Sequence, residues 1–221
     1  SKVILITDSE YQVVSIDQSI PLPDYVFYPN SDTDKTAVEW TVDDLNVAEV
    51  ATTTDANGKV SGTVKAKAAG VAVVKLQVVG KTEVNAAFRL IVRPTNEPKN
   101  CKADATYNSV SLSWSPVADA NGYTITRKVE GSDTEQTIAH VDGTDTVSYK
   151  DTAAQTGISY IYHVYAYTKY TNNGQTDYAN TDAYASVKAT PQLGKAAMTS
   201  VTAEGYSLSL IHISEPTRLQ L

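Results

Sequence analysis

The side chains best suited to bind a ligand are tyrosines, and ten of the 14 tyrosines lie between residues 95 and 191. Strand alternation places Tyr165, Tyr167 and Tyr184 on an outward-facing side, where exposed rings could stack on sugar rings or on a protein partner. Tyrosine also favours sheets for its packing, with its hydroxyl in water, and we favour this simpler interpretation. These three tyrosines are therefore the candidate surface-binding residues.

Residues with catalytic or metal-binding chemistry are few and are not arranged as a site. His140 and His163 fall on separate expected strands, with no cysteine or second histidine at ligand spacing. Residues 43–46 and 142–145 supply clustered Asp and Asn oxygens, which turn chemistry explains without calcium. We interpret the single cysteine, Cys101, as a small apolar residue in the first strand of a sandwich. The sequence predicts no catalytic residue, no cofactor and no metal site, and hence no enzyme.

The charge of the chain excludes one class of partner. The net charge is −7, with −3 over residues 1–94, −4 over 95–191 and zero over the remainder. Because there is no basic stripe, nucleic-acid binding through phosphate neutralisation is not expected. No apolar run approaches the ~18 residues of a membrane span, so the fragment is expected to hold none.

The segment 157–167 carries the clearest secondary-structure signal. Its strict alternation of aromatic and β-branched residues predicts a half-buried strand. Gly157, three residues before Tyr160, predicts a corner in which the tyrosine hydroxyl bonds back to the upstream backbone. A shorter alternating run around Trp114 requires a facing sheet. The fold class is therefore all-β, with two tandem antiparallel β-sandwiches, for which 221 residues leave room.

The first of the two modules, residues 1–94, resembles the bacterial immunoglobulin-like domain of group 2. The resemblance rests on V-E-W-T at 38–41, V-A-E-V at 47–50, N-G-K-V at 57–60 and K-A-A-G-V-A-V-V at 67–74. It covers about residues 3–93 and implies a buried Trp40. It also implies display outside the bacterial cell, and it brings no catalytic residue.

The second module, residues 95–191, is similar to the fibronectin type III domain. The resemblance rests on S-V-S-L-S-W-S-P-V at 109–117, N-G-Y-T-I-T-R-K at 121–128, S-Y-K-D-T at 148–152, G-I-S-Y-I-Y-H-V-Y-A-Y at 157–167 and V-K-A-T-P at 187–191. It implies that Trp114, Tyr123 and Tyr160 are core and corner residues. The integrin-binding Arg-Gly-Asp loop of that family is absent, because residues 170–175 of the connecting loop read Tyr-Thr-Asn-Asn-Gly-Gln. Both resemblances imply immunoglobulin-like sandwiches.

The boundaries of the modules follow from proline-containing linkers. Residues 93–98 form a polar, double-proline linker that we expect to be semi-stiff, and the boundary is placed between residues 94 and 95. Residues 192–207 are interpreted as the truncated start of a third sandwich. Residues 208–218 resemble the in-frame translation of a transposon-type sequencing adapter, so 208–221 is interpreted as a non-native tail. The chain is therefore expected to be a metagenomic gene fragment, cut at both ends.

Two functions remain open from the sequence. The first is a set of non-catalytic spacer or adhesion modules in a secreted or cell-surface bacterial multidomain protein. The alternative is an accessory, carbohydrate-binding region of a secreted polysaccharide- or cell-wall-degrading enzyme whose catalytic domain lies outside the fragment. In either case the location is extracellular or on the bacterial cell surface, and protein or polysaccharide ligands are expected to bind through neighbouring domains.

Overall fold

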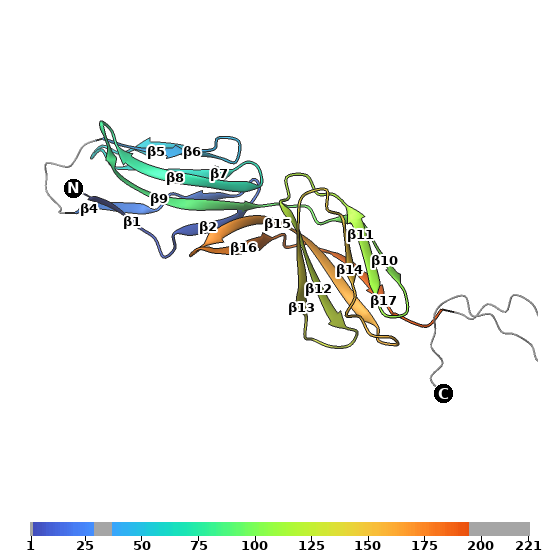
Figure 1. Ribbon diagram of the computed structural model, residues 1–221. Helices are drawn as coiled ribbons and strands as arrows, with labels where there is room; N and C mark the ends of the chain where they lie inside the picture. Colours follow the sequence, from blue (N-terminus) through green and yellow to red (C-terminus); the bar gives the residue numbers. More distant parts are fainter. Residues whose placement is uncertain (1, 29–36, 195–221) are drawn as a thin grey trace, which may run out of the picture.

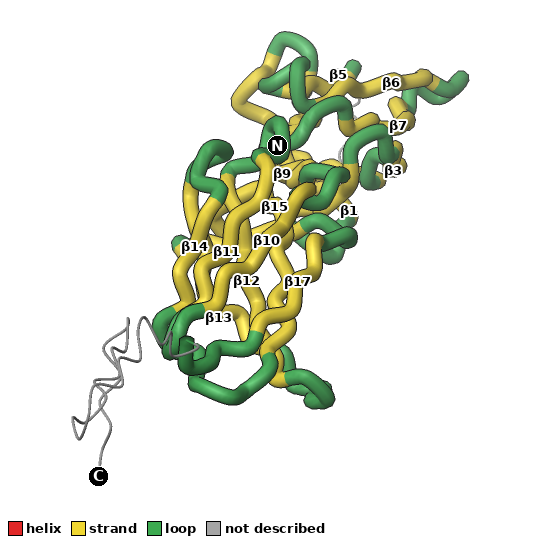
Figure 2. The backbone as a smooth tube through the Cα atoms, turned by 90° about the vertical axis from the view of Figure 1, so that its right-hand side faces the viewer, coloured by secondary structure: helices red, strands yellow, loops and turns green. Residues whose placement is uncertain are grey.

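The computed structural model describes residues 2–28 and 37–194, and within these residues the chain is all-β with no helix (Figures 1 and 2). Strands as far as β9 pair only among themselves, as do those from β10 onward, so two β-sandwiches follow one another along the chain. This confirms the predicted fold class. The predicted boundary between residues 94 and 95 falls between β9 and β10.

In its described residues, 2–28 and 37–93, the N-terminal sandwich contains nine strands: β1 (Lys2–Ile6), β2 (Tyr11–Ser15), β3 (Ser19–Pro21), β4 (Asp24–Tyr28), β5 (Val38–Val42), β6 (Ala48–Thr54), β7 (Val60–Ala66), β8 (Gly70–Val78) and β9 (Lys81–Arg93). They form sheets ordered β2-β9-β8-β5, β3-β7-β6 and β1-β4. All pairs are antiparallel except β2 with β9, which is parallel. Trp40 is buried in the core, as predicted, with its ring 6.4 Å from that of Phe88 in an edge-to-face arrangement.

The C-terminal sandwich contains eight strands: β10 (Lys99–Ala105), β11 (Val110–Ser115), β12 (Gly122–Val129), β13 (Gln136–Asp142), β14 (Ser148–Asp151), β15 (Tyr160–Asn172), β16 (Gln175–Asn180) and β17 (Ala185–Ala189). One sheet is ordered β10-β11-β14 (Figure 2), and the other β13-β12-β15-β16, with β17 also pairing with β15. Alternate residues of the two inner faces fill the space between the sheets. Trp114 and Tyr123 pack edge-to-face there at 5.3 Å.

The predicted tyrosine corner is present at the start of β15. The Gln155 amide donates a hydrogen bond of 3.2 Å to the Tyr160 hydroxyl, five residues downstream. Gly157 lies between them with a φ of 81°, a left-handed conformation that glycine adopts without a steric penalty. The corner therefore fixes where β15 enters the core.

The hairpin of β15 and β16 is longer than its sandwich requires. The two strands pair as far as Asn172 and Gln175, and Asn173 and Gly174 make the turn with φ values of 49° and 77°. Positive φ at both turn positions is typical of the tight hairpin turn that matches strand twist. The hairpin projects past its own sandwich and lies beside β2 and β9 of the other (Figure 1). The segment expected to be a connecting loop at 170–175 is thus mostly strand.

The C-terminal end of the chain contributes no further strand to the described structure. Residues 192–194 follow β17 without regular secondary structure. The rest of the proposed third-module segment 192–207 and the adapter-like residues 208–221 lie outside the described residues. No helix among the described residues is long and apolar enough to cross a membrane.

Candidate functional surfaces

The outer face of the β13-β12-β15 sheet carries the candidate tyrosines of β15. The inward-pointing residues of β15, such as Tyr162 and Val164, lie in the core, and the residues between them point away from it. His163 pairs across the strands with Thr126, and Tyr165 pairs with Thr124. The side chains of His163 and Tyr165 therefore point away from the core, on the face that the sequence alternation predicted.

Tyr167 differs from the prediction, because it lies on this outer face but is fully buried. Its ring lies over Gly122, its partner across the strands, where an added Cβ would come 2.5 Å from the tyrosine hydroxyl. The ring of Tyr178 covers it at 4.8 Å. The hydroxyl donates to Asp142 Oδ1 at 2.6 Å, and burial followed by this carboxylate raises the pKa of Tyr167. Tyr167 cannot offer a ring to a ligand, so it is removed from the candidate set.

Tyr165 and Tyr184 do form an accessible aromatic pair. Tyr165 is partly exposed, and Tyr184, in the connection between β16 and β17, is 44% exposed. Their ring centroids are 5.1 Å apart at an angle of 51°, and the His163 ring lies 4.2 Å from that of Tyr184. We call Tyr165, Tyr184, His163 and the neighbouring Glu135 the tyrosine patch.

A polar network holds the base of the tyrosine patch. His163 is only 7% exposed, and its Nδ1 lies 2.9 Å from Glu135 Oε1. The Thr126 hydroxyl donates to the same carboxylate oxygen. Burial acts to raise the pKa of Glu135, but the hydrogen bonds from Thr126 and His163 outweigh it and leave the pKa below its usual value. The carboxylate is therefore ionised and fixed in position at neutral pH.

The other histidine of this face takes part in a separate stack. The ring of His140 lies 3.7 Å from that of Tyr178, at an angle of 4°. Its Nδ1 is 3.0 Å from the Thr124 hydroxyl, which donates to Asn180 Oδ1. Burial lowers the pKa of His140. Among residues 2–28 and 37–194, no group of three His, Cys, Asp or Glu side chains is placed to hold a metal ion.

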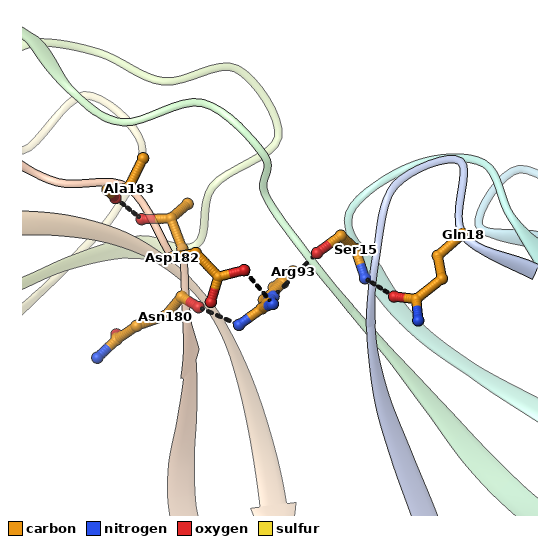
Figure 3. A network of polar contacts seen from close by, with 7 residues as sticks. Ser15, Gln18, Arg93, Asn180, Asp182 and Ala183 are labelled. Atoms are coloured by element: carbon orange, nitrogen blue, oxygen red, sulfur yellow. Dashed lines mark hydrogen bonds and ion pairs between the residues drawn. The ribbon is translucent and has the colours of Figure 1, made fainter.

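The contact between the two sandwiches is a second surface, which the sequence analysis did not identify. Arg93, the last residue of β9, donates from Nε to Ser15 Oγ at 3.1 Å and from Nη1 to the Asn180 carbonyl at 3.3 Å. Its Nη2 pairs with Asp182 Oδ2 at 2.5 Å (Figure 3). One side chain thus connects β2 of one sandwich with the end of β16 in the other.

An apolar cluster lies next to Arg93 and completes the contact between the two sandwiches. We call this whole contact the joint. Ile91 is on the outer face of β9 yet is fully buried, against Tyr170, Ala179 and Tyr11. The Tyr11 and Tyr170 rings are 5.4 Å apart. The buried Thr168 hydroxyl donates to the Val92 carbonyl at 2.7 Å. The one sequence signal for the joint was an isoleucine between two inward-facing residues, Leu90 and Val92.

A depression of about 470 Å³ lies on the N-terminal sandwich, lined mainly by Tyr25, Phe27, Val38, Lys59 and Val60. Lys59 is paired there with Asp24 at 2.7 Å. The described lining contains no nucleophile beside a base, so it suggests no reaction.

The strand arrangement defines the chain as two tandem sandwiches of the immunoglobulin-like class. No family model and no curated protein matches the sequence. A Fn3-like protein from Clostridium thermocellum is similar at 29% identity and a TM-score of 0.32, over 45% of this chain and 97% of that one. Titin domains A168–A170 are similar at 15% identity and a TM-score of 0.37, over 82% and 63%. A myokine structure has 19% identity and a TM-score of 0.34, over 44% and 98%.

Proposed function

We propose that the chain is a pair of non-catalytic spacer or adhesion modules in a secreted or cell-surface bacterial multidomain protein. Sandwiches of this class are common in cell-surface proteins, which supports an extracellular location. The N-terminal sandwich would be a bacterial immunoglobulin-like module and the C-terminal one a fibronectin type III module. The two would act by setting the distance and direction between the domains on either side.

The joint is the observation that carries this proposal. If the two modules were independent, Ile91 and Tyr170 would be exposed to water. In this structure each of them is buried against the opposite sandwich. Burying one such apolar side chain contributes about 1.5–3 kcal/mol. The hydrogen bonds of Arg93 and Thr168 add direction to this packing. The two sandwiches therefore hold one relative orientation, as a rod-like spacer requires.

Small-angle X-ray scattering tests this proposal. The wild-type chain should give the scattering curve calculated for the docked sandwiches. The double variant R93A/Y170A should give a curve that needs an ensemble of orientations, because it loses the polar and the apolar halves of the joint. K188A removes an ion pair with Glu130 that lies within the C-terminal sandwich, and it should match the wild type. A wild-type curve that already requires a flexible ensemble would reject the proposal.

A second candidate function is an accessory, carbohydrate-binding region of a secreted polysaccharide- or cell-wall-degrading enzyme. The accessible pair of Tyr165 and Tyr184 favours it. The genomic DNA that flanks this coding sequence separates the two candidates. A hydrolase domain supports the enzyme-associated function, whereas further sandwich repeats or a surface-sorting signal support the spacer.

The module boundaries are part of the proposal. We assign residues 1–94 and 95–191 to the two sandwiches, 192–207 to the start of a third, and 208–221 to an adapter-derived tail. Resequencing of the parent gene tests the last assignment. Native DNA that encodes residues 211–221 without a junction would overturn it.

A further inference from the structure

The outer face of a sheet normally exposes its polar side chains to water, but this one buries several of them. Thr124, Thr126 and His163 are 1%, 8% and 7% exposed. The coverage comes from the side chains of the same face, chiefly Glu135 and the tyrosines. Such packing fixes rotamers before any ligand arrives, and a pre-organised surface binds with a smaller loss of conformational entropy.

The tyrosine patch combines two kinds of contact surface in one place. Tyr165 and Tyr184 present tilted aromatic rings, whose faces favour CH groups. Beside them, Glu135 presents a carboxylate that is held in position by hydrogen bonds from Thr126 and from His163, which is itself buried. A ligand that fits must have one apolar face and a rim of hydroxyl groups. A pyranose ring has this amphipathic form.

The charge around the tyrosine patch limits the ligand further. The Coulomb attraction of Lys128 is the weakest of the causes that lower the pKa of Glu135, so the Glu135 carboxylate keeps its negative charge and disfavours an anionic ligand. The guanidinium of Arg127 is paired with the buried Asp151, and Lys188 is paired with Glu130. The patch therefore lacks the forked arginine contacts that bind phosphate or carboxylate ligands.

We propose that the tyrosine patch of the C-terminal sandwich binds a neutral sugar residue of a polysaccharide. The sugar stacks on Tyr184 and Tyr165, and its hydroxyl groups donate to Glu135. This inference goes beyond the spacer function and gives the second candidate function a specific site. It departs from the simpler interpretation of Tyr165 and Tyr184 as residues that only pack the sheet. The scattering experiment on the joint and the binding experiment below can fail independently.

Affinity gel electrophoresis of the full chain tests the site. The probes are hydroxyethylcellulose, galactomannan and soluble glycol chitin, with polygalacturonate as the acidic control. At least one neutral polymer should retard the wild-type protein, and polygalacturonate should not. Y184A should weaken retardation about fivefold or more, since a lost aromatic contact is typically worth close to one factor of ten. Tyr184 lies outside the strands, so its replacement should leave the fold intact.

Matched variants separate the site from a general effect of losing a tyrosine. Y107A removes a tyrosine that is 49% exposed in the same sandwich but away from the patch, and it should bind as the wild type does. E135Q should weaken binding without changing the near-ultraviolet circular dichroism. The proposal is overturned if no neutral polymer retards the wild type, if only polygalacturonate does, or if Y184A and Y107A behave alike.

Discussion

The two halves of strand β15 show how one sequence pattern can serve two different packing partners. From Tyr160 to Ala166, alternate residues point into the core of their own sandwich. The same face continues through Thr168 and Tyr170, but these residues pack on the other sandwich. The alternation is unbroken, and only the surface that covers it changes. Periodicity therefore predicts which side chains share a face without predicting what covers that face.

The largest effect should come from the core half of β15. Tyr162 donates to Asp151 Oδ2 at 2.8 Å, and Arg127 Nη1 lies at the same distance from this oxygen. Asp151 is 2% exposed, so D151A leaves a half-buried guanidinium without its counter-charge. We expect a loss of about 3–5 kcal/mol in the free energy of unfolding, measured by urea denaturation.

The joint offers the matched control for this ion pair. D182A removes the carboxylate that pairs with Arg93. The side chain of Asp182 is 80% exposed. The loss in unfolding free energy should stay below about 1 kcal/mol because water screens the pair. Equal losses for D151A and D182A would contradict the distinction between a closed core and a joint.

An intermediate effect should come from the joint half of β15. T168V keeps the side-chain shape but removes the hydroxyl that donates to the buried Val92 carbonyl. We expect a loss of about 1–2 kcal/mol, because the carbonyl is left without this partner. Amide hydrogen exchange should show faster exchange in the β15–β16 hairpin and unchanged protection near Tyr162. Loss of protection across the whole strand would show that its two halves are not separable.

A smaller, pH-dependent effect should come from the tyrosine patch. The folded-state pKa of Glu135 is below its usual value, so its carboxylate stabilises the folded chain at neutral pH. This contribution is fully present above the ordinary Glu pKa of about 4.3, and it is lost as the pH falls from there through the lower folded-state pKa. Between pH 7 and pH 3 the wild type should therefore lose more stability than E135Q does.

The comparison for this pH effect is E130Q, which changes an exposed glutamate paired with Lys188. Its pH dependence should follow the wild type closely. If E130Q and E135Q reduce the pH dependence equally, the network around His163 does not stabilise the fold.

The smallest effect on stability should come from Tyr184. Its side chain is 44% exposed and lies outside the strands, so Y184A should change the unfolding free energy by no more than about 0.5 kcal/mol. Thermal denaturation measures this change. A larger loss would mean that Tyr184 is part of the structure of the sheet rather than a free ligand-binding ring.

Much of the fold could be predicted from the sequence, because its signals are local. The alternation around Trp114 and Tyr160 and the corner at Gly157 predicted strands and burial that the structure confirms. The extension of β15 to Asn172 was missed, although Asn173-Gly174 is a hairpin signal of the same kind as Asn57-Gly58. Its polar residues lack a clear hydrophobic alternation, and the extension packs on the N-terminal sandwich.

The two surfaces could be predicted only in part, because both depend on distant partners. Tyr167 is buried since Gly122, on another strand, leaves room for its ring. Ile91 is buried since a hairpin some 80 residues later in the chain covers it. Neither partner is visible from the neighbours of Tyr167 or Ile91 in the sequence. Tyr165 and Tyr184 are partly exposed, but their packing with His163 and the contact of His163 with Glu135 were not predicted.

The fixed orientation of the two sandwiches is the central claim, and a distance measurement between spin labels tests it most directly. Labels on T53C in β6 and D133C, both exposed positions on opposite sandwiches, can be placed in a C101S background. Pulsed electron paramagnetic resonance should give one narrow distance distribution, which R93A/Y170A broadens. A distribution for the otherwise unaltered joint that is as broad as that of the double variant would contradict the account.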